Sequence, residues 1–341
     1  MTNTPDMTRN DNLLEVHGLK THFFTDDGIL KAVDGVTFSL RKGRTLGVVG
    51  ESGCGKSITS LSIMRLVDKP GRIVDGQIFF KGRNLLELSP QTMQSIRGNE
   101  IAMIFQDPMT ALNPVLTIGD QLSEVLLVHQ SMKTAKARTA VVQMLADVGI
   151  TDPARRFSQY PHSLSGGIQQ RAMIAMALLC KPDLLIADEP TTALDVTIQA
   201  QILALIKEMK RELGTSILFI THDLGVIAEL ADDIIVMYGG KIVEAGPVRD
   251  IFKRSRHPYT IGLLRCLPRL DRDEEELFTI RGRVPSLLAS VPGCAFSMRC
   301  PYVQNRCRES APELTEVGPG HQTACWRWAE NIFIGPTGEG K

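Results

Sequence analysis

A glycine-rich run of eight residues carries the clearest chemistry in the chain. It matches the pattern G-x-x-x-x-G-K-[ST] and lies between an apolar stretch that predicts a buried strand, Thr45–Val49, and a segment with apolar residues at helical spacing, Ile58–Leu66. Backbone N–H groups of such a loop bind phosphate, the lysine can reach the β- and γ-phosphates, and the serine hydroxyl can coordinate Mg²⁺. We therefore predict a nucleoside triphosphate site, the phosphate loop, formed by Gly50, Glu51, Ser52, Gly53, Cys54, Gly55, Lys56 and Ser57.

Two adjacent carboxylates end a second apolar stretch, Leu184–Glu189. A carboxylate at the carboxyl end of a strand faces the ligand crevice of an open α/β sheet. Asp188 suits a Mg²⁺ role, and Glu189 suits the polarisation of a water for attack on the γ-phosphate. Taken alone, the pair is equally well explained as a solvated strand end.

Two further apolar stretches end in polar side chains of the same kind of site. Ser216–Ile220 is followed closely by His222, and Ile101–Phe105 ends at Gln106. An imidazole at that edge can touch the γ-phosphate or its attacking water. The Gln106 amide can orient a water or bind Mg²⁺. A lone histidine at a strand end is usually structural, so these assignments depend on the phosphate loop.

A second glycine-rich run, Leu164–Gln170, lacks a lysine of its own. Ser165 is predicted to cap the helix that follows, and Gly166 and Gly167 would leave its N–H groups uncovered. The run, here called the signature run, thus predicts an anion site at a helix start. An ordinary helix cap is the alternative.

In this order the motifs resemble those of the ATP-binding subunit of an ABC transporter. One departure is Ile168, which stands where the family often has glutamine. By this resemblance the phosphate loop corresponds to the Walker A motif, Gln106 to the Q-loop glutamine and the signature run to the family's signature motif. Leu184–Asp188 corresponds to Walker B, Glu189 to the catalytic base, Ala193–Asp195 to the D-loop and His222 to the switch histidine.

The resemblance implies an α/β fold, an ABC-type ATPase with a RecA-like core, an antiparallel β subdomain and an inserted helical subdomain, plus a small Cys-rich C-terminal extension. In this family two ATPase subunits enclose ATP between the Walker A loop of one and the signature of the other. Adenine would stack on Phe24, with Phe23 in reserve, although either ring can instead be core. The residues expected to face the partner's ATP are Ser165, Gly166, Gly167, Gln169 and Asp195.

Composition and patterning predict the organisation of the chain. Lys+Arg and Asp+Glu both total 38, so no basic excess indicates a nucleic-acid partner. The polar N-terminus is not a signal peptide, and no apolar run approaches the roughly 20 residues of a membrane span. We expect a disordered start at 1–12, an ATPase domain at 13–253 with its helical block at about 107–180, and a C-terminal extension at 254–341.

The C-terminal extension holds four of the seven cysteines, Cys294, Cys300, Cys307 and Cys325, with the spacing C-x₅-C-x₆-C-x₁₇-C. Disulfides do not suit a reducing compartment, and zinc sites usually show closer pairs. A four-thiolate cluster, zinc and unliganded thiols all stay open on spacing alone. His257-Pro258-Tyr259 followed by four cysteines resembles the oligopeptide/dipeptide and nickel importer branch, which favours a structural [4Fe-4S] cluster, with zinc as the alternative.

These observations together predict the ATPase subunit of an importer for dipeptides or oligopeptides. The resemblance implies a second ATPase subunit, forming a heterodimer, two integral membrane permease subunits, an extracytoplasmic substrate-binding protein and a peripheral place on the cytoplasmic face of the bacterial inner membrane. The same role for nickel or another small solute is one alternative. A non-transport ABC ATPase is another, although such proteins usually have two cassettes or a coiled-coil insertion.

Overall fold

The computed structural model describes residues 11–107, 111–191, 195–267, 278–282 and 292–330 of the 341-residue chain. The predicted disordered start up to residue 10 and the predicted D-loop residues Ala193 and Leu194 lie outside the described residues. The strands are β1 (Asn12–Thr25), β2 (Gly28–Arg41), β3 (Thr45–Val49), β4 (Gly71–Phe80), β5 (Arg83–Asn84), β6 (Ile101–Ile104), β7 (Leu184–Asp188), β8 (Ser216–Ile220), β9 (Asp233–Tyr238), β10 (Lys241–Pro247), β11 (Thr315–Gly318) and β12 (His321–Thr323). The helices are α1 (Lys56–Ile63), α2 (Pro90–Ile96), α4 (Ile118–Gln130), α5 (Thr134–Asp147), α6 (Pro153–Phe157), α7 (Gly166–Leu178), α8 (Val196–Leu213), α9 (Leu224–Leu230), α10 (Val248–Arg254), α11 (Pro258–Arg265) and α12 (Asn305–Glu309), with 3₁₀ turns at Leu85–Glu87, Pro161–Ser163 and Trp326–Glu330.

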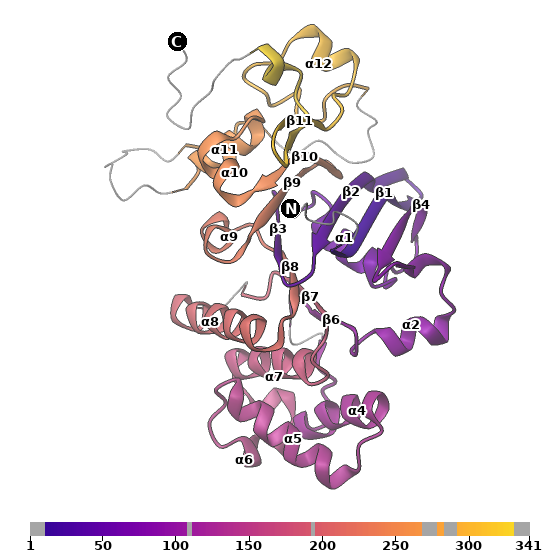
Figure 1. Ribbon diagram of the computed structural model, residues 1–341, viewed down its shortest axis with the longest axis vertical. Coiled ribbons are helices and arrows are strands. Elements are labelled where there is room, and N and C mark those ends of the chain that lie inside the picture. The colour runs from indigo at the N-terminus through magenta and orange to yellow at the C-terminus, as the bar shows by residue number, and fades with distance from the viewer. Residues whose placement is uncertain (1–10, 108–110, 192–194, 268–277, 283–291, 331–341) are drawn as a thin grey trace, which may run out of the picture.

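The main sheet has eight strands in the order β11-β12-β10-β9-β3-β8-β7-β6 (Figure 1). Strands β9, β3, β8, β7 and β6, the last of which is an edge strand, run parallel, and β10, β12 and β11 add antiparallel pairs at the other edge. Every residue of β3, β7 and β8 is buried, which explains why these strands appear in the sequence as continuous apolar runs. Alternate side chains enter two different cores: Leu185 and Ala187 pack with α7, α8 and α9, whereas Leu184 and Ile186 pack with α1 and the second sheet.

The second sheet is antiparallel, in the order β2-β1-β4-β5. The sequence of residues 13–105 predicts short strands around the helix after the phosphate loop, but β1 and β2 each have 14 residues. The two-residue turn between Thr25 and Gly28 keeps both strands paired over almost their whole length. Several register shifts along the pair indicate bulges, which curve the strands and break the alternation of buried and exposed residues.

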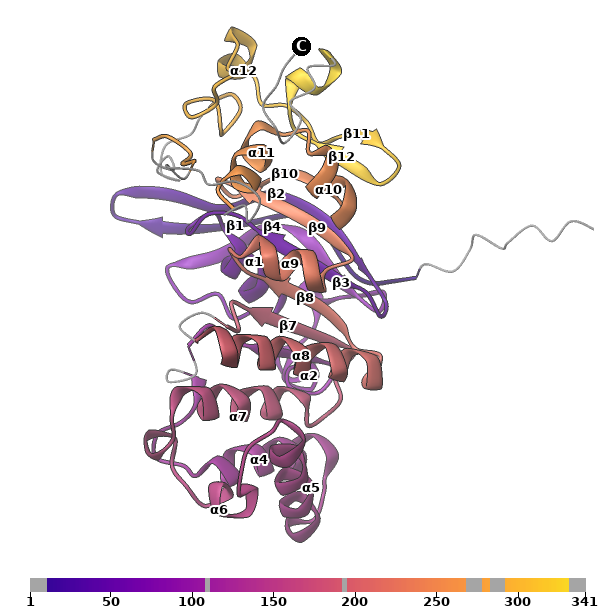
Figure 2. The same cartoon turned by 90° about the vertical axis from the view of Figure 1, so that its left-hand side faces the viewer.

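Helices α4, α5, α6 and α7 form a block below α8 in the view of Figure 2. Residues 117–180 carry helical spacing with predicted breaks at Gly149, Pro153 and Pro161, and the chain turns at all three: Gly149 has a φ of 75°, Pro153 begins α6, and Pro161 begins a 3₁₀ turn. One break was not predicted. Ser131 ends α4 in the left-handed conformation, so the first long helical segment is two helices and not one.

The C-terminal extension is fastened to the main sheet through a buried carboxylate. Strand β12 pairs with β10, and Glu244 of β10 is fully buried. Its carboxylate accepts the backbone N–H groups of Arg256 and His257 and contacts His321 Nε2 at 2.8 Å. Burial lowers the pKa of His257 to about 3, and the neutral Nδ1 accepts the N–H of Tyr259 at 3.1 Å. The extension thus packs against the core beside the main sheet, where Phe296 joins the same cluster of buried residues as Tyr238 and Val243.

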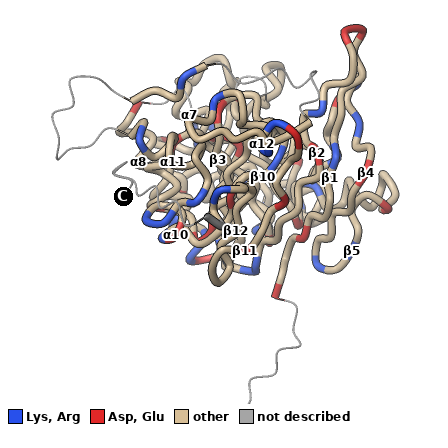
Figure 3. The backbone as a smooth tube through the Cα atoms, turned by 90° about the horizontal axis from the view of Figure 1, so that it is seen from above, with Lys and Arg blue, Asp and Glu red and all other residues tan. Residues whose placement is uncertain are grey.

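Charge is distributed without a single-sign face in the view of Figure 3, where Lys and Arg positions are interspersed with Asp and Glu. Among the described residues, none of the helices combines the length and the apolarity that a membrane crossing requires.

Candidate nucleotide site

The phosphate loop joins β3 to α1, as the sequence predicts. Two of its glycines are required by close backbone approaches. A Cβ on Gly50 would overlap the carbonyl oxygen of Met237, and a Cβ on Gly55 would overlap that of Ala32. Both residues also have positive φ angles, 153° and 102°. The loop is therefore held tightly between β9 and β2, with the start of α1 directed at its hollow.

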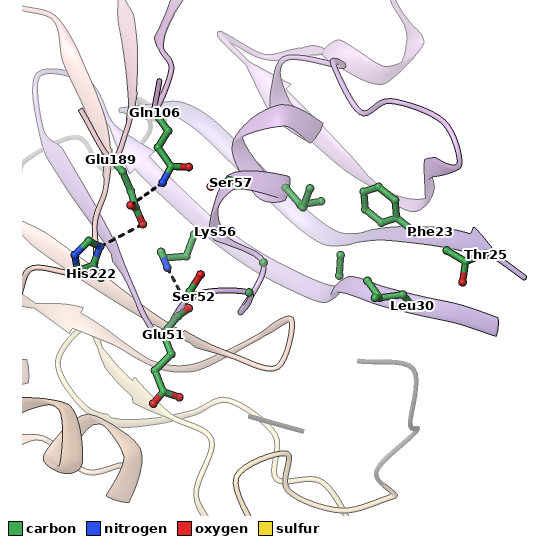
Figure 4. A pocket seen from close by; sticks show the side chains of 14 residues that line it. Phe23, Thr25, Leu30, Glu51, Ser52, Lys56, Ser57, Gln106, Glu189 and His222 are labelled. Atoms are coloured by element: carbon green, nitrogen blue, oxygen red, sulfur yellow. Dashed lines mark hydrogen bonds and ion pairs between the residues drawn. The ribbon is translucent and has the colours of Figure 1, made fainter. Parts of the chain in front are cut away.

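The phosphate loop and the residues that follow the strand ends line one pocket (Figure 4). The parallel strands β3, β6, β7 and β8 deliver their carboxyl ends to one edge of the sheet, where ligands bind in such folds. The residues that line the pocket are Phe23, Thr25, Leu30, Ala32, Glu51, Ser52, Gly53, Gly55, Lys56, Ser57, Ile58, Gln106, Glu189 and His222. Gly50 and Cys54 lie beneath the surface of the loop, and Cys54 is buried.

Lys56 and Ser57 face the first predicted carboxylate. Lys56 Nζ donates to the carbonyl oxygens of Gly50 at 2.8 Å and Glu51 at 3.1 Å, and Ser57 Oγ donates to Asp188 Oδ1 at 3.0 Å. A serine hydroxyl beside a carboxylate is a donor set of hard oxygens, which fits Mg²⁺ completed by phosphate oxygens and waters. Burial raises the pKa of Asp188 to about 6, helped by the neighbouring Glu189 and opposed by the Ser57 hydrogen bond.

Asp188→Asn is expected to stabilise the nucleotide-free protein. The folded-state pKa lies above the ordinary value of 3.8, so ionised Asp188 disfavours folding, and this cost grows as the pH rises from about 4 to 6. We expect the free energy of unfolding to rise by about 1–3 kcal/mol at pH 7.5 and by roughly half as much at pH 5. Urea denaturation at both pH values measures this, with the exposed Asp147→Asn as control. A gain that does not shrink at pH 5 would contradict the prediction.

Two polar side chains meet at the second carboxylate, that of Glu189 (Figure 4). Glu189 Oε2 accepts from Gln106 Nε2 at 3.1 Å, and Glu189 Oε1 lies 3.4 Å from His222 Nδ1. Only 12% of the Glu189 side chain is exposed, whereas 61% of His222 is. Glu189 itself has a φ of 46°, an unfavourable conformation for a residue with a side chain, and its N–H is held by the carbonyl of Ile220 at 2.9 Å. The structure therefore brings together all three residues that the sequence analysis placed at separate strand ends.

The structure distinguishes the two phenylalanines near the far end of the pocket. Phe23 lines the pocket, with its ring against Gly71, whereas Phe24 lies beneath the guanidinium of Arg72 at 4.0 Å and does not line it. Successive side chains of β1 point to opposite faces, so only one of the two phenylalanines can face the pocket. Phe24, our first choice from sequence, does not line this pocket, and Phe23, the reserve, does.

Phe23→Ala is expected to weaken ATP binding about tenfold, because stacking of a base on an aromatic ring contributes roughly 1–3 kcal/mol. Phe24→Ala is the matched control and is expected to change the Kd less than twofold. Titration with a fluorescent ATP analogue measures both. Equal losses in the two variants would show that the effect comes from the β1–β2 hairpin as a whole.

The signature run and Asp195 do not line this pocket. Ser165 occupies the N-cap position of α7, but its side chain makes no capping hydrogen bond, which differs from the prediction. Gln169 is buried and donates to the carbonyls of Pro161 at 2.8 Å and Leu164 at 3.2 Å, so it supports the turn before the helix. Asp195 caps α8 by accepting the N–H of Ile198 at 2.9 Å. A Cβ on Gly166 would meet no heavy atom within 4 Å, so the start of α7 is open.

The predicted iron–sulfur site is wrong. Cys294, Cys300, Cys307 and Cys325 border one small cavity, yet no group of three or more His, Cys, Asp or Glu side chains in the described ranges is placed to hold a metal ion. All four are free cysteines. Burial raises the pKa of Cys300 to about 11 and that of Cys325 to about 12. The four cysteines, of which Cys307 is buried and the others are partly buried, act here as small apolar side chains around the cavity that Phe296 also lines.

Sequence reasoning missed two contacts to the phosphate loop. Tyr259 Oη accepts the N–H of Glu51 at 2.8 Å, and Arg299 forms an ion pair with the Glu51 carboxylate. Both partners belong to the C-terminal extension. In the sequence, His257-Pro258-Tyr259 indicated the importer branch but gave no indication that Tyr259 contacts the phosphate loop.

Two family models match the chain: "ABC transporter" at residues 33–192 and "Oligopeptide/dipeptide transporter, C-terminal region" at residues 243–307. The "Probable peptide ABC transporter ATP-binding protein y4tR" of Sinorhizobium fredii is 54% identical over 326 residues, covering 95% of this chain and 97% of that protein. The "Dipeptide transport ATP-binding protein DppD" of Bacillus subtilis is 53% identical over 317 residues, covering 93% of this chain and 95% of that protein.

The fold is also similar to a solved ATP-binding cassette. A dimeric post-hydrolysis structure of the cassette MJ0796, bound to ADP and Pi, matches with a TM-score of 0.63 and 26% identity over 69% of this chain and 99% of that one. The predicted fold class and the resemblance stated from the motifs are both confirmed. The chain is an ABC-type ATPase and belongs to the ABC transporter ATP-binding family, in the group that carries the oligopeptide/dipeptide transporter C-terminal region.

Proposed function

We propose that this chain hydrolyses ATP to power the import of dipeptides or oligopeptides across the inner membrane of a bacterium. The observation that carries the ATPase role is the meeting of Lys56 and Ser57 with Gln106, Glu189 and His222 around one pocket. The peptide cargo is supported by the match to the oligopeptide/dipeptide C-terminal region and by the names of the similar proteins.

The geometry supports a division of roles in the reaction. Loop N–H groups and Lys56 bind the β- and γ-phosphates, and Phe23 stacks on the base. Ser57 and Asp188, with Gln106 nearby, would hold Mg²⁺, which neutralises charge on the phosphate oxygens when it is bound. The Glu189 carboxylate orients a water and accepts its proton as the water oxygen bonds to the γ-phosphorus and the bond to the ADP oxygen breaks. Gln106 and His222 hold the Glu189 oxygens at 3.1 and 3.4 Å.

ATPase subunits of ABC importers act as dimers with membrane permeases, typically with a substrate-binding protein. For this chain we propose a different ATPase chain as partner, two permease subunits, an extracytoplasmic binding protein and a peripheral position on the cytoplasmic face of the membrane. The open start of α7, away from the chain's own pocket, supports a role of Ser165, Gly166 and Gly167 at ATP held by the partner. We propose that Gln169 supports the turn before α7, and that Asp195 lies near the same ATP molecule at the dimer interface.

Uptake by reconstituted membranes tests the cargo. The chain, its ATPase partner, the permeases and the binding protein are placed in proteoliposomes with ATP on the side of the ATPase subunits. Radiolabelled dipeptide and tripeptide should accumulate in an ATP-dependent manner, and ⁶³Ni²⁺ should not. Accumulation of nickel without peptide would replace the peptide cargo by a metal ion. Failure to recover permeases with the chain from detergent-solubilised membranes would exclude the importer role.

A further inference from the structure

We propose that Arg299 and Tyr259, both in the C-terminal extension, are positioning residues for ATP binding that act through Glu51 of the phosphate loop. The proposal rests on the phosphate loop being the ATP site. It makes the extension a control element of that site, so a partner or condition that shifts the extension would change ATP affinity.

Both terminal nitrogens of the Arg299 guanidinium donate to the Glu51 carboxylate. Nη1 lies 2.5 Å from Glu51 Oε2, and Nη2 lies 3.0 Å from Glu51 Oε1. Such a bidentate arginine–carboxylate pair fixes orientation as well as distance. The Arg299 side chain is only 5% exposed and that of Glu51 is 28% exposed, so solvent screens this pair less than a surface ion pair.

The guanidinium is itself fixed from the extension side. Arg299 Nε donates to the carbonyl of Arg281 at 3.1 Å, and Nη2 also donates to the carbonyl of Ile280 at 3.2 Å. Nη1 lies 3.4 Å from Tyr238 Oη. Two of these contacts come from the extension itself and one comes from β9 of the main sheet, so the guanidinium is held in place where the extension meets the sheet, and the Glu51 side chain is held with it.

Tyr259 holds the backbone of the same loop residue. Its hydroxyl accepts the N–H of Glu51 at 2.8 Å, so this N–H faces the extension and not the hollow of the loop. Tyr259 is fully buried, and its ring packs against Tyr238 and Phe296 with centroid distances of 4.7 and 5.3 Å. A rigid aromatic cluster thus sets the conformation of the loop directly before its phosphate-binding N–H groups.

The negative charge of Glu51 explains why the ion pair with Arg299 matters for the phosphate loop. A carboxylate within an anion-binding loop repels phosphate unless it is neutralised and turned away. Figure 4 shows the Glu51 carboxylate directed away from Lys56, toward the side where Arg299 binds it. Without Arg299 the carboxylate becomes free to turn toward Lys56 Nζ, which already contacts the Glu51 carbonyl at 3.1 Å, and would compete there with the phosphates.

The test is a double-mutant cycle on the full-length chain, with the Kd for a fluorescent ATP analogue as readout. Arg299→Gln is expected to raise the Kd about tenfold, within the usual range of coupling between two sites. In a Glu51→Gln background, which has no charge to neutralise, the same change should raise the Kd less than about threefold. Arg83→Gln, which breaks a remote ion pair with Glu100, is the matched control and should leave the Kd unchanged.

Further readouts separate positioning from simple loss of stability. Arg299→Gln should raise the KM for ATP while kcat at saturating ATP stays within about threefold, and Tyr259→Phe should raise the Kd about threefold. If Arg299→Gln does not fold, Arg299→Lys takes its place, with a smaller loss that again shrinks in the Glu51→Gln background. An unchanged Kd in the folded arginine variant, or an equal loss in both backgrounds, overturns the inference. A wild-type chain that binds no ATP would instead overturn the proposed function.

Discussion

Replacing Glu189 by Gln is expected to lower ATP hydrolysis by about 10²- to 10⁴-fold, while the Kd for ATP stays within about twofold. The amide keeps the shape of the side chain and still accepts a hydrogen bond from Gln106 Nε2, which lies 3.1 Å from the carboxylate. It cannot accept the proton of the attacking water. Because the Glu189→Gln change keeps the size and shape of the side chain and removes only its ability to accept the proton, we expect it to remove a transition-state interaction and to spare ground-state binding.

The measurement is single-turnover hydrolysis of γ-³²P-ATP by the assembled dimer, beside equilibrium binding of an ATP analogue. Glu208→Gln serves as the matched control, because Glu208 lies on α8 with its side chain 54% exposed. Wild-type hydrolysis in Glu189→Gln would remove Glu189 as the base. A large loss of binding together with hydrolysis would mean that Glu189 shapes the loop and not the chemistry.

The parts of the fold that sequence predicts well are the parts buried on both faces. The bounds of β3 and β8 agree with the predicted strands residue for residue, because a strand covered on both sides must be apolar throughout. The lengths of β1 and β2 could not be predicted in the same way. Their bulges shift the register, so the alternation that marks a half-buried strand is interrupted several times within each strand.

The same distinction applies to the site. The phosphate loop, Gln106, Glu189 and His222 follow from local patterns, since each lies directly after an apolar strand of one parallel sheet. The choice between Phe23 and Phe24 depends on which face of β1 meets the pocket, and a one-residue difference in register reverses it. The contacts of Glu51 with Tyr259 and Arg299 join residues 208 and 248 positions apart, and no local pattern carries information on such a pairing.

The cysteine spacing led to a wrong prediction for a related physical reason. Spacing restricts which ligands a loop can offer, but a metal site also requires the side chains to converge as deprotonated donors. In the structure the extension gains its stability from β12 and the buried Glu244, so its thiols serve as packing.

Gly166→Asp is expected to abolish hydrolysis of ATP held by the partner subunit while leaving the isolated chain intact. Gly166 is the first residue of α7, and a Cβ there meets no heavy atom within 4 Å. An acidic residue in the first turn of a helix is favourable by about 0.3–1 kcal/mol, so the variant should be at least as stable as the wild type. Its own Kd for ATP should change less than twofold, because the signature run lies outside its own pocket.

In the assembled dimer the new carboxylate would occupy the anion site at the start of α7 and repel the γ-phosphate held by the partner, with an expected loss of about 10²-fold or more. Introducing Gly166→Asp together with Glu189→Gln isolates this effect, because Glu189→Gln silences the chain's own site and the remaining turnover reports on ATP bound by the partner. Gly318→Asp, which places the same charge on β11, is the control and should leave that turnover unchanged. Retained turnover in the Gly166→Asp dimer would exclude the signature run from the composite site. A loss of ATP binding by the isolated chain would instead assign the run to the chain's own pocket. Misfolding would not explain such a loss, because a Cβ at Gly166 meets no heavy atom within 4 Å.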